Sequence, residues 1–156
     1  RNAIIDFFLV ENKTAYGITF DPYDVANAPH MIEKIYVPTF EPEGYTLILG
    51  EYSNSRVEYL WENEHGEYIN YRQTVIKQGT LDSVPVAIDA ERTKRTTQNI
   101  NDYLVEIIYN QVEQQYIAVW TDNRYIYKVD ISVLGSDQET ILKAIMDSLV
   151  EAETIS

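Results

Sequence analysis

Hydrophobic and polar side chains alternate most regularly over residues 116–131, which is the period-two pattern of two antiparallel β-strands. The pair Asp122-Asn123 lies between the two runs, and both residue types tolerate the positive φ that a two-residue type I′ turn requires. A turn at this pair would place Trp120 opposite Tyr125. The pattern therefore predicts a hairpin that carries its large aromatic side chains on one face.

A helical pattern follows the hairpin directly. Ser136 and Glu139 have the spacing of a capping box, which favours a helix that begins at Ser136. The apolar residues after the box recur at the spacing of one helical stripe: Ile141, Leu142, Ile145, Met146, Leu149 and Val150. We expect this stripe to lie against the aromatic face of the sheet.

Upstream of the hairpin, runs rich in β-branched and aromatic residues predict a meander. Its three strands are residues 45–52, 57–61 and 68–76. Residues 103–109 predict a further strand that leads to the hairpin, residues 16–20 predict a short one, and residues 84–90 are another candidate. Residues 92–101 are polar and are predicted to be a connection rather than a strand.

The N-terminal region is predicted to be partly helical. Apolar residues at Ala3, Ile4, Phe7 and Phe8 suit a short amphipathic helix over residues 2–10. Residues 21–24 are either a turn or the start of a brief helix running toward Ile35. The predicted fold is α+β: an antiparallel sheet of about six or seven strands, a C-terminal amphipathic helix on one face and a short N-terminal helix. We expect one domain over residues 1–156, with an extension at 1–34 and a core at 35–151.

Composition narrows the classes of partner. The 156 residues carry a formal net charge of −13, which argues against nucleic acid. The one basic cluster, Arg92, Lys94 and Arg95, lies in the predicted polar connection. Cysteine is absent, so disulfides and thiolate chemistry are excluded. The sequence begins at Arg1 without methionine and has no spanning segment or signal peptide, so we expect a piece of a longer protein.

Few residues form patterns that indicate catalysis. His65 lies among Glu62, Glu64 and Glu67, but such acidic loops usually face water, and no metal or other cofactor is predicted. His30 has no nucleophile at a spacing that defines a relay. Glycine-rich phosphate loops are also missing. We therefore expect a protein that is not an enzyme.

Tyrosines are the more informative group, because the chain has thirteen of them. Four aromatic residues of the predicted meander could form a concave surface for an apolar or peptide ligand: Tyr59, Trp61, Tyr68 and Tyr71. Alternate residues of a strand more commonly become core, and that interpretation stays open for the same four residues.

Several short motifs also resemble a known family. They are Tyr36-Val-Pro-Thr-Phe-Glu-Pro-Glu-Gly-Tyr45, Ile88-Asp-Ala-Glu91, Val119-Trp-Thr-Asp122 with Tyr125-Ile-Tyr127, and the terminal Asp147-Ser148-Leu149. In order and spacing they resemble the bacterial family catalogued as domain of unknown function 4367, over roughly residues 35–151. The resemblance implies the outer part of a Firmicutes membrane protein with one membrane-spanning helix, in some cases in an anti-sigma-factor-like setting. It implies no catalytic residues, because the family has no established activity.

Three functional hypotheses follow. The first is a non-catalytic extracytoplasmic module, anchored to the membrane through a span outside this sequence, that senses or binds a protein or cell-envelope ligand. The second is a carrier that holds a lipid or lipoprotein tail in a curved, aromatic-lined sheet. The third is a hydrolase, which would need two carboxylates facing each other across a cleft at roughly 5 to 9 Å.

Overall fold

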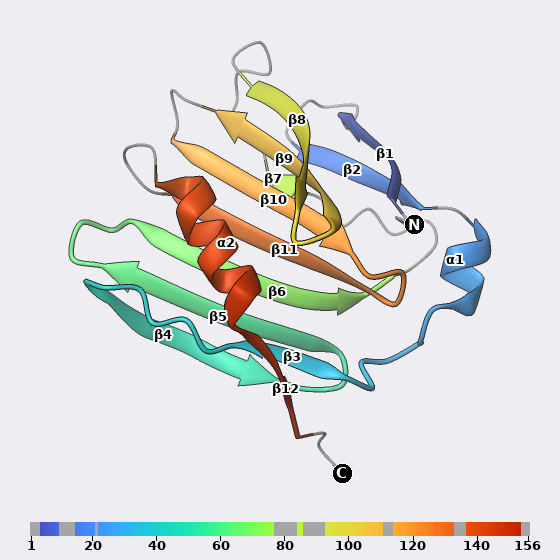
Figure 1. Ribbon diagram of the computed structural model, residues 1–156, viewed down its shortest axis with the longest axis horizontal. Helices are drawn as coiled ribbons and strands as arrows, with labels where there is room; N and C mark the ends of the chain where they lie inside the picture. The colour runs from blue at the N-terminus through green and yellow to red at the C-terminus, as the bar shows by residue number, and fades with distance from the viewer. Residues whose placement is uncertain are drawn as a thin grey trace.

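A seven-stranded antiparallel sheet dominates the computed structural model, in the order β4-β5-β6-β11-β10-β9-β8 (Figure 1). The structure describes residues 4–9, 15–20, 22–76, 84–85, 93–110, 114–132 and 137–153. The strands of the large sheet are β4 (Tyr45–Tyr52), β5 (Arg56–Asn63), β6 (Tyr68–Val75), β8 (Thr93–Ile100), β9 (Tyr103–Asn110), β10 (Gln115–Thr121) and β11 (Tyr125–Ser132). The predicted antiparallel sheet of six or seven strands is thus confirmed.

Two meanders make up this sheet. Strands β4, β5 and β6 follow one another, as the alternating runs predicted, and β8 to β11 form the second series. The two series meet where β6 pairs with β11, with Tyr71 opposite Val129. This arrangement leaves β4 and β8 as the two edges of the sheet among the described residues.

The C-terminal helix α2 (Gln138–Ser148) crosses one face of the sheet, as predicted (Figure 1). Leu142 and Ile145 are fully buried in the core cluster beneath it. The predicted end of the helix is wrong, because Leu149 has an extended backbone and begins β12 (Leu149–Ala152), which pairs with β3 (Ile35–Pro38). At the start of the helix Asp137 is the N-cap and makes no side-chain capping bond, whereas Ser136 lies outside the described residues.

The hairpin of β10 and β11 forms with a register two residues away from the predicted one. Trp120 pairs with Tyr127 instead of Tyr125. The reason is a longer loop held by Asp122, whose Oδ1 accepts hydrogen bonds from the backbone N–H groups of Arg124 at 2.9 Å and Tyr125 at 2.8 Å. Because the shift is an even number of residues, every side chain keeps its predicted face.

The polar segment predicted to be a connection is strand β8. Lys94 and Arg95 of the basic cluster lie on this strand, while Arg92 lies outside the described residues. Asn101 and Asp102, both at positive φ, join β8 to β9 with Ile100 opposite Tyr103. The prediction failed because an edge strand needs few apolar side chains, and β8 has mostly polar ones.

The N-terminal prediction is also wrong in part. Residues 2–10 were expected to be helical, but β1 (Ile4–Leu9) is a strand that pairs with β2 (Ala15–Phe20). Pairing with β2 overrides the helical spacing of the apolar residues. The helix of this region is instead α1 (Pro22–Asn27). A two-residue strand β7 (Val84–Pro85) completes this smaller sheet, and the rest of the predicted strand 84–90 lies outside the described residues.

Both faces of the central strands are buried. The α2 face carries aromatic residues, and on the opposite face Ile117, Val119 and Ile126 are also buried. Figure 1 draws β1 and β2 behind the large sheet, on the side away from α2. Strands β10 and β11 are therefore buried almost continuously along their length.

Three buried side chains of the sheet bind the backbone of the segment that contains β3. Gln73 donates from Nε2 to Lys34 O at 2.9 Å, and its Oε1 accepts from Tyr36 N at 2.9 Å. The Tyr71 hydroxyl donates to Tyr36 O at 2.8 Å, and the Tyr125 hydroxyl accepts from Lys34 N at 3.1 Å. These bonds hold β3, and the loop that follows it, above the α2 face of the sheet.

Candidate functional site

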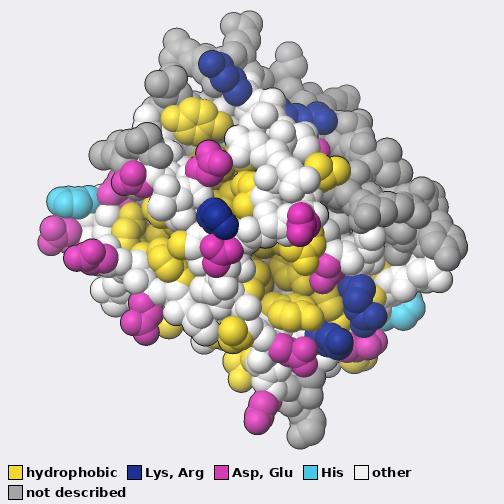
Figure 2. Space-filling view, viewed as in Figure 1, with side chains coloured by type: hydrophobic (Ala, Val, Ile, Leu, Met, Phe, Trp, Pro, Cys, Tyr) yellow, Lys and Arg dark blue, Asp and Glu magenta, His cyan; other side chains and the backbone are white. Residues whose placement is uncertain are grey.

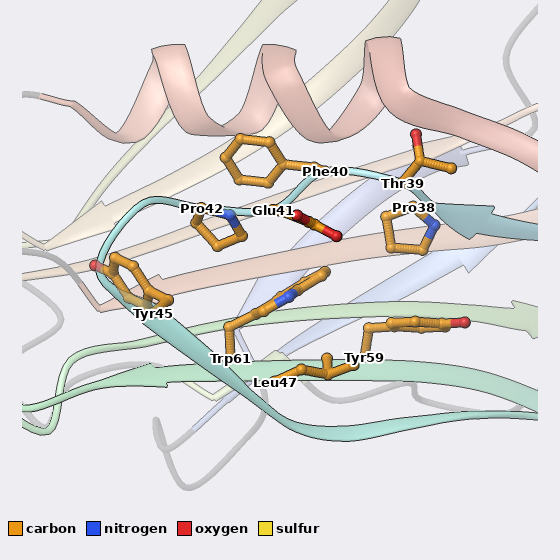
Figure 3. Close-up of a pocket in the computed structure, with 9 residues that line it drawn as sticks. All are labelled: Pro38, Thr39, Phe40, Glu41, Pro42, Tyr45, Leu47, Tyr59 and Trp61. Atoms are coloured by element: carbon orange, nitrogen blue, oxygen red, sulfur yellow. The ribbon is translucent and has the colours of Figure 1, made fainter.

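The residues after β3 roof a hollow of about 300 Å³ between α2 and the β4 edge (Figure 3). Its floor comes from the two outermost strands on this side, and its roof from the loop that enters β4. The lining consists of Pro38, Thr39, Phe40, Glu41, Pro42, Tyr45, Leu47, Tyr59 and Trp61. We call this hollow the edge pocket.

Aromatic rings form the floor of the edge pocket. The rings of Tyr59 and Trp61 lie 5.9 Å apart between centroids, tilted by 33°. Leu47 pairs with Trp61 across the strands, and Gly50 pairs with Tyr59. A Cβ atom at Gly50 would lie 3.2 Å from the Tyr59 ring, so glycine lets this ring lie closely over β4.

Two prolines stiffen the roof. Pro38 and Pro42 are buried, and they restrict the backbone on both sides of Phe40. The loop is also bonded to α2, because Thr39 donates from its backbone N–H and its hydroxyl to Ser148 O, at 3.2 and 2.8 Å. The pocket is therefore preformed rather than dependent on a flexible lid.

The electrostatics of the edge pocket are simple. Glu41 contributes the one carboxylate among its lining residues, and it lies between the roof and the aromatic floor (Figure 3). Burial, and then the neighbouring Tyr52, raise the pKa of Tyr59. Burial and Glu67 raise the pKa of Tyr45, against a hydrogen bond with Asn63. Both phenols stay neutral, so the pocket offers an apolar floor and one negative charge.

The four predicted ligand residues separate into three environments. Tyr59 and Trp61 both line the edge pocket. Tyr71 is buried in the core and holds β3 through its hydroxyl. Tyr68 faces the opposite side of the sheet, where its hydroxyl donates to Asp130 at 3.3 Å. The reason is strand alternation, since residues 59, 61 and 71 share one face by register and residue 68 does not.

Sequence reasoning missed the roof and the outer strand as parts of this site. Residues 36–45 were interpreted only as a family motif, and Leu47 only as part of the predicted strand 45–52. A signal was present, because Phe40 is a large aromatic residue between two prolines in a loop. Such a residue is either buried or available to a ligand.

A polar cluster lies on the face of the sheet opposite α2 and the edge pocket. Burial alone would raise the pKa of Glu58, but hydrogen bonds from Arg72 Nε at 2.9 Å and Asn70 Nδ2 at 3.1 Å outweigh it and lower the pKa. Burial raises the pKa of Asp130 to about 6, partly offset by the charge of Lys128 and the Tyr68 hydrogen bond. These groups neutralise one another within the sheet.

The acidic loop around His65 offers no metal centre in the described part of the chain. His65 Nε2 lies 3.5 Å from Glu64 Oε1, and both side chains are exposed. Glu67 Oε1 accepts a hydrogen bond from Asn63 Nδ2 at 2.7 Å. Over the described residues, no three His, Cys, Asp or Glu side chains come together as metal ligands.

Fold and pocket together define an α+β domain with one helix across an antiparallel sheet and a preformed apolar hollow at one edge. The chain belongs to the family described as Domain of unknown function (DUF4367), which matches residues 35–148. The resemblance inferred from the short motifs is thus confirmed. No curated protein and no solved structure matches the chain significantly. None of the helices within the described ranges has the length and apolar character needed to cross a membrane.

Proposed function

We propose that this domain is a non-catalytic binding module that holds an extended segment of a partner protein along β4. The observation that carries the proposal is the exposure of apolar side chains on an edge strand: Leu47 is 49% exposed and Ile48 is 55% exposed. Soluble proteins usually protect such an edge with charge or proline, because its free backbone groups invite pairing. An added strand would use those groups for main-chain hydrogen bonds.

The edge pocket supports this mode of binding. Leu47 belongs both to the exposed strand and to the pocket lining, so the free edge and the hollow are continuous. An extended segment beside β4 would direct alternate side chains to the α2 face of the sheet. A volume of about 300 Å³ suits one or two apolar side chains, and lies at the lower end for a whole small-molecule ligand.

Charge near this edge favours a basic segment. Glu41 lines the pocket, and Glu43 and Glu51 are exposed beside β4. Arg56, on the neighbouring strand, has Glu51 and Glu58 as partners at 3.9 and 3.3 Å. The preferred segment is therefore extended, with apolar residues that alternate with lysine or arginine.

The location of the module is part of the proposal. Family resemblance supports an extracytoplasmic domain of a single-span bacterial membrane protein, in which the partner is another envelope protein. A membrane-impermeant amine reagent applied to intact native cells tests this location on the full-length protein. Lysine labelling without cell lysis is expected, and labelling only after lysis would contradict the location.

The carrier hypothesis has less support. It requires one continuous aromatic groove, but α2 and the β3 segment cover the aromatic face, where Tyr71, Trp120 and Tyr125 are buried. The edge pocket is a separate hollow to one side of the helix (Figure 3). A lipid tail would need α2 to move away from the sheet and expose its own Leu142 and Ile145, which are fully buried.

Peptide selection followed by NMR tests the binding proposal. Short random peptides are displayed, selected on the domain and then titrated into the isotope-labelled protein. The expected result is slower hydrogen exchange at outward-facing β4 amides, with shifted signals at Tyr59 and Trp61. Leu47→Lys should weaken binding at least roughly tenfold. Thr96→Lys also introduces a lysine at an exposed edge-strand position, but on β8. It is the matched control and should leave binding unchanged.

Three outcomes would contradict the proposal. The first is a set of selected peptides that shift signals on other surfaces, or no selected peptide at all. The second is pairing of β4 with a second copy of the chain, seen as concentration-dependent β4 signals without peptide. The third is turnover of a selected peptide by the domain, which would replace binding by catalysis.

A further inference from the structure

A second hollow, of about 270 Å³, lies beside the C-terminal end of α2. Residues from several segments meet there: β3, the β8–β9 turn, the start of β9, the end of β10, the β10–β11 loop, the start of β11, α2 and β12. Its lining residues are Tyr36, Asn101, Tyr103, Trp120, Asp122, Tyr127, Met146 and Leu149. We call it the tyrosine cleft. Figure 2 shows exposed apolar atoms in this region beside the helix, with acidic side chains around them.

Aromatic rings make up most of the tyrosine cleft. Trp120 stacks on Tyr127 with 5.4 Å between ring centroids and 13° between planes. Tyr36 meets Tyr127 edge-on, at 6.4 Å and 62°. Tyr103 is 37% exposed, so one of the four rings is open to solvent at the mouth. Trp120 and Tyr127 are buried and Tyr36 is half-buried, so the ring surface open to a ligand comes mainly from Tyr36 and Tyr103.

Asp122 contributes the one carboxylate in the lining of the cleft. Its Oδ2 accepts a hydrogen bond from the Tyr127 hydroxyl at 2.8 Å, and its Oδ1 accepts two backbone N–H groups. Burial, and then the charge of Asp122, raise the pKa of both Tyr127 and Tyr103. The charge of Asp122 therefore acts on two of the four rings that line the cleft.

Cations that border the cleft have acidic partners. Lys143 Nζ lies 3.2 Å from Asp147 Oδ2 and also donates to Asn101 Oδ1 at 3.1 Å. Arg124 lies 3.4 Å from Glu33. Neither cation lines the hollow. Anionic ligands would meet the Asp122 charge, and a metal ion would find too few oxygen ligands around one carboxylate.

We propose that the tyrosine cleft binds an organic cation, an alkylammonium or guanidinium group, between its aromatic rings and Asp122. Such a group is attracted by the faces of tyrosine and tryptophan rings, and a carboxylate beside the rings adds a full charge. The Tyr127–Asp122 hydrogen bond strengthens the effect, because a phenol that donates to a carboxylate has a more electron-rich ring. The source of the cation is either a free amine or a side chain of a polypeptide.

A titration with matched probes tests this inference. Choline is the quaternary ammonium probe, and 3,3-dimethylbutan-1-ol is its neutral isostere. N-acetyl-lysine methylamide and N-acetyl-arginine methylamide represent a polypeptide side chain. The expected result is saturable shifts of the Trp120 indole and Asp122 amide signals, with a cation binding roughly tenfold more tightly than the isostere. The probe that binds more tightly, choline or an amino-acid amide, identifies the source.

Variants connect the binding to the cleft. Asp122→Asn keeps the Oδ1 acceptor for the loop and should weaken binding of the cation roughly tenfold. Tyr103→Leu preserves apolar volume at an exposed position and should weaken it severalfold. Leu104→Ala, at the exposed neighbour of Tyr103 that lines neither hollow, is the control and should change nothing. Equal binding of the neutral isostere, an unaffected Asp122→Asn variant, or no saturable shift with any cation at millimolar concentration would overturn the proposal.

Discussion

The two edge strands of the large sheet are both mostly exposed but have opposite compositions. Strand β8 reads Thr-Lys-Arg-Thr-Thr-Gln-Asn-Ile, and strand β4 reads Tyr-Thr-Leu-Ile-Leu-Gly-Glu-Tyr. Each has a neighbour on one side within the described residues. Lysine, arginine and threonine on β8 are the usual protection of a free edge, whereas β4 exposes leucine and isoleucine.

The difference teaches that the β4 edge is not simply the end of the sheet. The fold would tolerate polar residues at positions 47 and 48, because both side chains are about half exposed and contribute little to the core. Protection at β8 shows that this chain does use polar edges. An apolar edge beside a preformed pocket is the feature on which the proposed partner strand rests.

The largest expected effect is the loss of stability on replacing Trp61, which lies on β5 and lines the edge pocket. Trp61 is buried, so Trp61→Ala should lower the free energy of unfolding by about 3 kcal/mol through lost burial and a cavity. Chemical denaturation measures this change. Thr96→Ala on β8 is the comparison and should cost under about 0.5 kcal/mol. Equal losses of unfolding free energy for Trp61→Ala and Thr96→Ala would contradict the distinction between the two edges.

Binding is the next largest effect. The double variant Leu47→Lys and Ile48→Lys gives β4 the character of β8. It should weaken binding of selected peptides more than tenfold, or about 1.4 kcal/mol, because charges replace apolar contacts. Stability should change by under about 0.5 kcal/mol, since both positions are exposed. Calorimetry and thermal unfolding on the same samples separate the two quantities, and a large stability loss would contradict the argument.

The alternation of side chains along the strands allowed β4, β5 and β6 to be predicted. The sequence marked β4 over its observed bounds, and β5 and β6 to within two residues at each end. Faces were also predictable, because the aromatic residues of β10 and β11 keep their side even though the hairpin register differs. Period-two patterns report the face of a side chain without fixing which residue it pairs with.

Strand β8 and the edge pocket were not predictable from local pattern. Strand β8 lacks alternating apolar residues, so the polar segment before the Asn101-Asp102 turn was predicted to be a connection. The edge pocket requires β3 to lie over the sheet, which depends on bonds from Gln73 and Tyr71 to residues far away in sequence. No single-sequence pattern reports such contacts.

A substitution at Asp130, in the middle of the sheet, tests whether the stability of the domain can change without a change in peptide binding at β4. Asp130 lies on β11, on the face away from the edge pocket, and its folded-state pKa is raised by burial to about 6 from the ordinary 3.8. Below about pH 4 the folded and unfolded states both hold the proton. Between pH 4 and 6 only the folded state keeps it, so stability falls as pH rises through this window.

Asp130→Asn should therefore stabilise the domain by about 1 kcal/mol at pH 7, less than the full shift because Lys128 loses its charge partner. The gain should disappear below pH 4. Denaturation curves across the pH range measure it, with Asp102→Asn, an exposed turn residue, as the control. Peptide binding at β4 should not change, and a change in affinity would link the edge to the stability of the whole sheet.

The smallest effect is expected when β8 is given the character of β4. Lys94 and Thr96 are exposed on one face of β8, so Lys94→Val with Thr96→Val should alter stability by only a few tenths of a kcal/mol. The change removes a charge and leaves an apolar, unpaired edge, which favours weak association between copies. Sedimentation velocity over a concentration series should detect it, and Lys94→Gln with Thr96→Ser should stay monomeric. A variant that stays monomeric at the highest concentrations would mean that apolar side chains alone do not make an edge adhesive. The proposed binding at β4 would then depend mainly on the pocket formed by Trp61, Tyr59 and the proline-flanked roof.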